Sequence, residues 1–134
     1  MSKLLEHKCV FRVRYADTDK MGIVYNGNYF TFFETGRTEL MRHFNLAYTL
    51  VEENGFLLPL TEANISYKSP ARYDDILEIF AKLEYDNSLQ IKFEYEIKIL
   101  EKLIAKGYTK HVFVTKEKMR PVKPPKFFLD LISE

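Results

Sequence analysis

The chain has 134 residues, of which 46% are hydrophobic and 29% charged, and its formal net charge is +1. This length predicts one domain with a single hydrophobic core, and the nearly neutral charge argues against nucleic acid or an anionic membrane surface as the main partner. The single cysteine excludes an internal disulfide, and because neither a signal peptide nor a run of about 18 apolar residues is present, we expect a cytoplasmic protein without a membrane span.

Residues 9–15 predict the first strand. The apolar residues Cys9, Phe11, Val13 and Tyr15 alternate with more exposed positions between them. Alternation with a period of two is typical of a strand with one buried face. On that face Cys9 is expected to be a buried thiol rather than a nucleophile.

The next segment is rich in acidic and turn-forming residues. Asp17 and Asp19 lie close together, and an Asn-Gly-Asn cluster follows at positions 26–28. Aspartate in a turn commonly accepts backbone N–H groups, and we assign this structural role to Asp17. The cluster predicts a helix N-terminus, with Asn28 as the N-cap and Asn26 as the alternative. A carboxylate near unpaired N–H groups at a helix start favours acyl transfer, because those groups stabilise an oxyanion.

An amphipathic helix is predicted from residue 29 to residue 44. Glu34 and Arg37 are three residues apart, which favours an ion pair on the helix surface. Gly36 leaves room on the apolar face for close packing. Residues 45–54 predict a shorter second helix. The apolar face of the first helix contains six residues at helical spacing: Tyr29, Phe32, Phe33, Gly36, Leu40 and Phe44.

Beyond residue 57 the apolar period changes from 3.6 to two, which predicts strands joined by short turns. One strand, a long aromatic helix and four further strands define an α+β domain with a mostly antiparallel sheet curled around the helix. The basic tail ends in an apolar segment, residues 127–132, expected to form a short helix that docks on a neighbouring molecule. The four predicted strands are residues 58–68, with a bulge near residues 61–62, and residues 77–85, 89–99 and 103–115.

Three motifs carry a family resemblance. Tyr-x-Asp-Thr-Asp-x-x-Gly-x-Val-Tyr-x-x-x-Tyr spans residues 15–29, Phe-Glu-x-x-Arg-Thr-Glu-x-x-Arg spans residues 33–42, and Tyr-Lys-Ser-Pro-Ala-Arg-Tyr-Asp-Asp spans residues 67–75. This combination resembles the hot-dog-fold acyl-CoA thioesterases of the 4-hydroxybenzoyl-CoA thioesterase and YbgC types. The likeness covers residues 8–120, which leaves residues 121–134 as a C-terminal tail of a single domain, residues 1–134.

The resemblance implies a long central helix wrapped by a five- or six-stranded antiparallel sheet. It also implies a homodimer or homotetramer that hydrolyses a thioester to a carboxylate and free CoA. This reaction needs no metal and no redox cofactor, and we expect neither. Two alternatives keep the same fold: a thioesterase acting on acyl carrier protein, and an acyl-CoA-binding protein without catalytic activity.

Carried over by position, the catalytic carboxylate of the family falls on Asp19, as nucleophile or as general base. The backbone N–H that polarises the thioester carbonyl falls at Asn26 or Gly27. Many YbgC-type relatives have His where this chain has Asn26. Because an amide does not take up a proton at neutral pH, Asn26 is left a hydrogen-bonding or helix-capping role. Glu34 is the alternative acid, since some hot-dog enzymes place their carboxylate on the central helix.

The remaining candidates concern substrate binding. Tyr25 and Tyr29 are interpreted mainly as packing residues, and both are candidates for contact with the substrate. Lys68 and Arg72 are candidates for binding the phosphates of CoA. Weaker candidates for the same role are Lys116, Lys118, Arg120 and Lys123. The three histidines lack metal-ligand spacing and are expected at the surface or at an interface: His7, His43 and His111.

Overall fold

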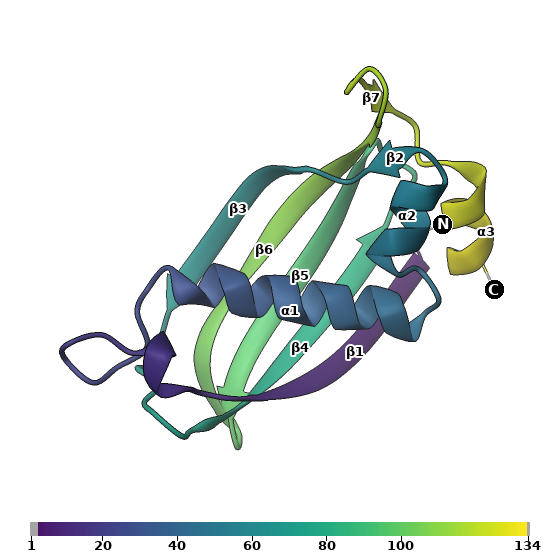
Figure 1. The fold of residues 1–134 in the computed structure, drawn as a ribbon. Coiled ribbons are helices and arrows are strands. Elements are labelled where there is room, and N and C mark those ends of the chain that lie inside the picture. The colour runs from purple at the N-terminus through teal and green to yellow at the C-terminus, as the bar shows by residue number, and fades with distance from the viewer. Residues whose placement is uncertain (1–2, 134) are drawn as a thin grey trace.

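The computed structural model describes residues 3–133, in which every strand belongs to one antiparallel sheet lying across a long helix (Figure 1). The elements follow one another in the order β1 (Lys3–Arg12), η1 (Tyr15–Asp17), α1 (Asn28–His43), α2 (Tyr48–Glu53), β2 (Phe56–Leu57), β3 (Leu60–Tyr67), β4 (Ile76–Tyr85), β5 (Gln90–Ile99), β6 (Lys102–Thr115), β7 (Pro121–Val122) and α3 (Lys126–Ile132).

The sheet has the strand order β1-β4-β5-β6, and β6 also pairs with β2, β3 and β7. The predicted five or six strands therefore correspond to five long strands, while the two-residue strands β2 and β7 bring the number in residues 3–133 to seven. The predicted bulge is confirmed, because the register between β3 and β6 shifts between Leu60 and Glu62. Strict alternation in β4 and β5 buries one side of each strand and exposes the other.

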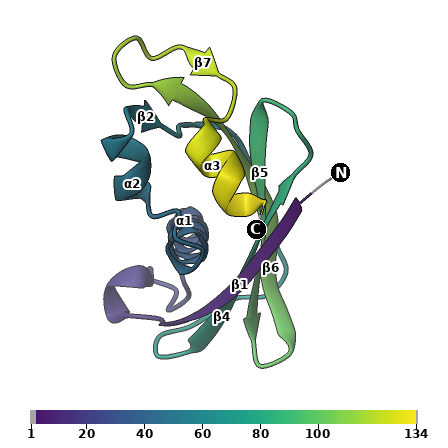
Figure 2. The ribbon, with the colours of Figure 1, turned by 90° about the vertical axis from the view of Figure 1, so that its right-hand side faces the viewer.

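Helix α1 packs its aromatic face against the concave side of the sheet, and Figure 2 shows it nearly end-on beside the strands. The predicted apolar face is confirmed: Phe33 is fully buried and stacks on Tyr95 of β5, with ring centroids 4.3 Å apart. Gly36 allows this approach, since a Cβ atom there would lie 2.7 Å from Cγ2 of Ile79 in β4. The helix is therefore held in one register against the sheet.

Two details at the start of the chain differ from the sequence-based prediction. Strand β1 ends at Arg12, and Tyr15, expected on a buried strand face, lies in η1 with 79% of its surface exposed. The N-cap of α1 is Gly27, and neither Asn26 nor Asn28 caps the helix with its side chain. The first prediction was wrong because local hydrogen bonds between Arg14 and Asp17 form a turn that ends the strand. The second was wrong because the Asn28 side chain donates to the carbonyl of Asp17 instead.

The C-terminal tail closes one end of the core. Strand β7 pairs with β6, and Phe128 of α3 is fully buried between the rings of Tyr85 and Phe113. The predicted short helix is confirmed, but its docking on a neighbouring molecule is not, because its apolar face is used within its own chain. No helix in residues 3–133 is long and apolar enough to cross a membrane.

Candidate active site

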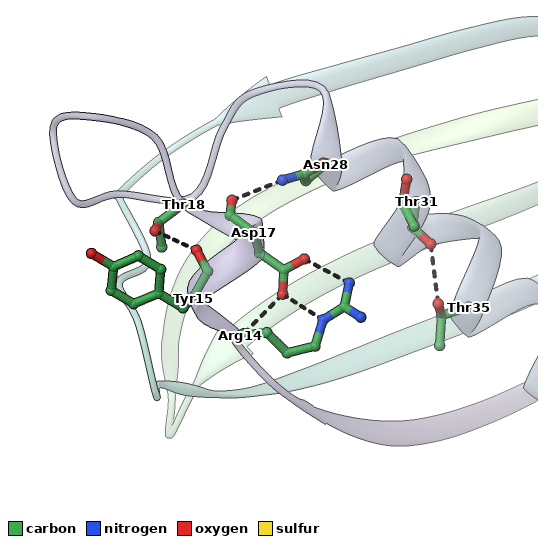
Figure 3. A network of polar contacts seen from close by, with 7 residues as sticks. All are labelled: Arg14, Tyr15, Asp17, Thr18, Asn28, Thr31 and Thr35. Carbon is green, nitrogen blue, oxygen red and sulfur yellow. Dashed lines mark hydrogen bonds and ion pairs between the residues drawn. The ribbon is translucent and has the colours of Figure 1, made fainter.

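Asp17 anchors the loop that leads to α1 (Figure 3). Its carboxylate accepts hydrogen bonds from Arg14: the backbone N–H at 2.8 Å, Nε at 3.2 Å and Nη2 at 2.9 Å. The side-chain bond from Arg14 lowers the pKa of Asp17, which is 4% exposed. Its backbone carbonyl accepts from Nδ2 of Asn28 at 2.7 Å and from the N–H of Tyr25 at 3.0 Å. Asp17 is therefore structural, as predicted, and Asn28 ties the helix start to it.

Asp19 lies in a tight turn of the same loop. Its Oδ1 atom accepts the N–H of Met21 at 2.8 Å, and its carbonyl accepts the N–H of Gly22 at 3.0 Å. Gly22 has a φ of +80°, a conformation that favours glycine. The Asp19 side chain is partly exposed, and within residues 3–133 no cation pairs with it. The loop thus presents a carboxylate whose charge is not neutralised by a neighbour.

The start of α1 presents two free donors. The N–H groups of Asn28 and Tyr29 donate to the carbonyls of Tyr25 and Asn26, at 3.0 and 3.3 Å. In the described part of the chain, the N–H groups of Asn26 and Gly27 have no protein acceptor. Such groups, together with the helix dipole, favour negative charge at this point. The same loop therefore contains a carboxylate without a cationic partner and a pair of donors suited to an oxyanion.

The segment after β3 forms the second wall of this loop. Tyr67 donates its hydroxyl proton to the carbonyl of Asn26 at 3.0 Å, and the N–H of Val24 donates to the carbonyl of Ala71 at 2.8 Å. An isolated bridge joins Ile23 to Arg72. Tyr67 begins the third motif but was not among the predicted site residues. It holds the carbonyl of Asn26 and so helps to orient the free N–H groups.

The predicted substrate-binding residues differ in accessibility. Tyr25 is 58% exposed, whereas Tyr29 is 3% exposed and packs against Tyr67, with ring centroids 5.4 Å apart. Lys68 and Arg72 are exposed, and Arg72 lies beside the loop through its bridge to residue 23. The structure thus brings Tyr25 and Arg72 to the candidate site and places Tyr29 in the core.

Other candidates lie away from the helix start. Glu34 is seven residues beyond Gly27 along α1, which corresponds to about 10 Å of helix. Its Oε1 atom is 3.9 Å from Nη2 of Arg37, in agreement with the predicted ion pair. The weaker basic candidates at positions 116–120 lie between β6 and β7, at the opposite end of the sheet from the loop before α1 (Figure 1). The structure does not bring them to the same site within one chain.

The histidines and the cysteine occupy different surroundings. Burial raises the pKa of the half-buried Cys9 thiol, as expected for a residue without a nucleophilic role. His7 and His43 stack with ring centroids 4.6 Å apart. His111 is 2% exposed, so its predicted place at the surface or at an interface was wrong for this chain. No cluster of three or more His, Cys, Asp or Glu side chains in residues 3–133 is arranged to hold a metal ion.

A curved antiparallel sheet around one long helix, with the candidate site at the helix start, defines a hot-dog fold of the thioesterase type. The family model described as the Thioesterase-like superfamily matches residues 13–132, and the chain belongs to this family.

Named relatives agree with this assignment. The "Putative acyl-CoA thioesterase YneP" of Bacillus subtilis is 37% identical over 119 residues, covering 88% of this chain and 86% of its own. The acyl-CoA thioesterase YbgC of Haemophilus influenzae is 34% identical over 116 residues, covering 86% of this chain and 85% of its own. The crystal structure of DHNA-CoA thioesterase from Staphylococcus aureus superposes with a TM-score of 0.87 at 28% identity, covering 93% of this chain and 85% of that one. The predicted family and fold are confirmed.

Proposed function

We propose that this protein is an acyl-CoA thioesterase that hydrolyses a thioester to a carboxylate and free CoA, with Asp19 as its catalytic carboxylate. The observation that carries the proposal is the loop of residues 19–27, which combines a carboxylate without a cationic partner in residues 3–133 with the free N–H groups of Asn26 and Gly27. Acyl transfer requires both a nucleophile or base and donors for the developing oxyanion. The names of the YneP and YbgC relatives support the substrate class.

The reaction proceeds by one of two routes. As a nucleophile, Asp19 adds to the thioester carbon, and the carbonyl oxygen takes negative charge facing the N–H groups of Asn26 and Gly27. Collapse of this intermediate breaks the carbon–sulfur bond, expels the CoA thiolate and leaves an acyl anhydride on Asp19, which water hydrolyses. As a general base, Asp19 instead takes a proton from the water that attacks the same carbon. Both routes use the same oxyanion donors.

Residues around the loop supply the binding contacts in this proposal. Tyr25, which is exposed beside Gly27, contacts the acyl group of the substrate. A Cβ atom on Gly27 would lie 2.9 Å from Cε2 of Tyr25, so glycine keeps the approach to the backbone open. Arg72, and Lys68 near it in sequence, attract the phosphates of CoA. Cys9 is a free thiol, which supports a reducing compartment, and we assign the protein to the cytoplasm.

A panel of acyl-CoA thioesters, assayed with a thiol-detecting dye, tests the proposed function. Short aliphatic, long aliphatic and aromatic acyl groups are compared, and the same acyl groups on acyl carrier protein form the second arm. The proposal expects dye reduction with at least one acyl-CoA, at a higher kcat/KM than with its acyl-carrier counterpart. Binding of acyl-CoA without thiol release would favour the non-catalytic alternative and contradict the proposal.

We also propose that the protein assembles as a homodimer or homotetramer. Strand β3 pairs only with β6 within residues 3–133, which leaves the backbone groups along its other edge without a strand partner. Unpaired strand edges favour association with another chain, and a second copy supplies a matching edge. Sedimentation at micromolar concentration tests this assembly: a single species of about the 15.9 kDa chain mass would contradict it.

A further inference from the structure

Glycine follows asparagine at two positions of the chain, Asn26–Gly27 and Asn54–Gly55. The first pair directly precedes α1, and the second joins α2 to β2 (Figure 1). An asparagine before glycine is chemically labile, because glycine has no side chain to keep its backbone nitrogen away from the asparagine side chain. All four residues are exposed, so exposure alone does not distinguish the two pairs.

The reaction at such a pair is an intramolecular attack. The backbone nitrogen of the glycine loses its proton and adds to Cγ of the asparagine, and the side-chain nitrogen leaves as ammonia. A succinimide ring closes, in which the former N–H group carries no hydrogen. One water molecule then opens the ring and leaves either aspartate or isoaspartate, whose backbone runs through the side-chain carbon. The reaction therefore needs an unbonded glycine N–H and an asparagine side chain that is free to turn.

Asn26 and Gly27 meet both requirements. Throughout residues 3–133, no acceptor takes the N–H of Gly27, and the side-chain amide of Asn26 has no hydrogen-bond partner. The pair occupies the middle of a turn, which the N–H of Asn28 closes by donating to the carbonyl of Tyr25 at 3.0 Å. The attacking nitrogen and the attacked side chain are thus both available without the loss of a hydrogen bond.

The surroundings also favour the negative charge that forms on the nitrogen of Gly27. The carbonyl of Asn26 belongs to the same peptide group, and it accepts the hydroxyl of Tyr67 at 3.0 Å and the N–H of Tyr29 at 3.3 Å. Hydrogen bonds to a carbonyl polarise its amide, which makes the N–H easier to deprotonate. The positive end of the α1 dipole acts in the same direction. The features that suit an oxyanion therefore also promote this reaction.

The second pair is held in the opposite way. The N–H of Gly55 donates to the carbonyl of Glu52 at 3.0 Å, and Nδ2 of Asn54 donates to the carbonyl of Leu50 at 2.8 Å. Both acceptors belong to α2, which Asn54 ends as its C-cap. Attack at this pair requires both bonds to break, so it proceeds only in molecules in which the turn opens. The second pair is therefore a control within the same molecule.

We propose that Asn26 is a site of spontaneous deamidation, converted through a succinimide with Gly27 to aspartate and isoaspartate. The succinimide lacks the N–H of Gly27, isoaspartate displaces that N–H by lengthening the backbone, and aspartate adds a negative charge beside it. Each product removes or opposes a donor of the candidate oxyanion site. The modification needs no activity, and only its consequence, a loss of turnover as the protein ages, rests on the proposed function.

Peptide mapping by mass spectrometry tests the proposal on the full-length protein, incubated above neutral pH both folded and in urea. In the folded protein, deamidation of Asn26 is expected to be at least about 10-fold faster than that of Asn54, because only the second site must first open. In urea no turn protects either site, so the two rates should agree within about threefold. Equal rates in the folded protein, or an unmodified Asn26 where the unfolded chain is modified, overturn the proposal.

Two variants test the assignment independently of the mapping. Deamidation adds a negative charge, so an acidic isoform accumulates during incubation, and ion exchange separates it. Asn26→Gln is expected to suppress this isoform, because the longer side chain closes its ring much more slowly, whereas the matched control Asn54→Gln retains it. An acidic isoform that persists in Asn26→Gln contradicts the assignment.

The separated isoforms test the consequence for the site. The acidic isoform of the wild type is expected to have a lower kcat for thiol release than the unmodified fraction of the same sample, because its oxyanion donors are altered. Equal turnover by the two fractions refutes this consequence. Turnover by neither fraction contradicts the proposed function instead, and deamidation measured by mass spectrometry still stands in that case.

Discussion

Asp17→Asn tests the loop that positions the candidate site, because it keeps the size of the side chain and removes its charge. The wild-type carboxylate is 4% exposed and accepts hydrogen bonds from the backbone N–H and the guanidinium of Arg14. Since 67% of the Arg14 side chain is exposed, we count chiefly the buried bond to the backbone. A hydrogen bond to a charged group contributes about 1.5–3 kcal/mol, so Asp17→Asn is expected to lower the free energy of unfolding by about 2 kcal/mol.

Thermal and urea unfolding measure this change, with Asp74→Asn as the matched control. In a domain of this size a loss of about 2 kcal/mol lowers the Tm by about 8 °C. Asp74 pairs with Arg12 at 3.1 Å, but both side chains are about 60% exposed, so its substitution is expected to cost less than about 0.5 kcal/mol. Equal destabilisation by both variants would refute the argument that burial makes the Asp17 interaction strong.

The pH dependence gives a second test of the same carboxylate. The bond from Arg14 lowers the pKa of Asp17 in the folded state. A lowered folded-state pKa means that the stabilisation is present above the unfolded value of about 4 and is lost as the pH falls through the folded value. The difference in stability between wild type and Asp17→Asn should therefore be full at pH 7 and shrink below pH 4. A difference that grows on acidification would contradict the assignment.

Three further predictions concern the helix start and the tail. Asn26→His should keep kcat within about threefold, because the backbone N–H survives. Asn26→Asp should lower kcat more, because its negative charge opposes the oxyanion. If Asn26→His loses more kcat than Asn26→Asp, the amide side chain is itself catalytic. Tyr67→Phe should lower kcat more than it raises KM, because the carbonyl of Asn26 loses the only hydroxyl group that donates to it in the described chain. An unchanged kcat would show that Tyr67 does not contribute to the site. Phe128→Ala should lower the free energy of unfolding in urea by about 3–5 kcal/mol, independently of protein concentration. A change in the oligomeric state alone would indicate that α3 docks on a neighbouring molecule.

The sequence predicted the central helix and the long strands because their patterns are strict. Phe33 and Gly36 lie on a helical face that the sheet covers, and polar and apolar residues alternate through all ten residues of β5. Local pattern and tertiary packing agree in these elements. The order of elements and the curvature of the sheet follow from that agreement.

The loop before α1 and the buried His111 depend on partners that are distant in the sequence. Asn28 bonds to the carbonyl of Asp17, eleven residues away, instead of capping its own helix. His111 bonds to Leu58, 53 residues away. For His111 a signal was nevertheless present, since residues 109, 111 and 113 have the same parity along a strand and share its buried face. Parity was a better guide to its burial than residue type.

The kcat of Asp19→Asn tests the central claim most directly. The variant is assayed for thiol release on the best acyl-CoA of the panel, beside Glu34→Gln and the wild type, and circular dichroism verifies that each is folded. An amide is a poor nucleophile and a poor base, so the account predicts a fall of at least about 10²-fold for Asp19→Asn and near-wild-type turnover for Glu34→Gln. Retained turnover in folded Asp19→Asn, with Glu34→Gln inactive, would contradict the account and move the catalytic carboxylate to α1.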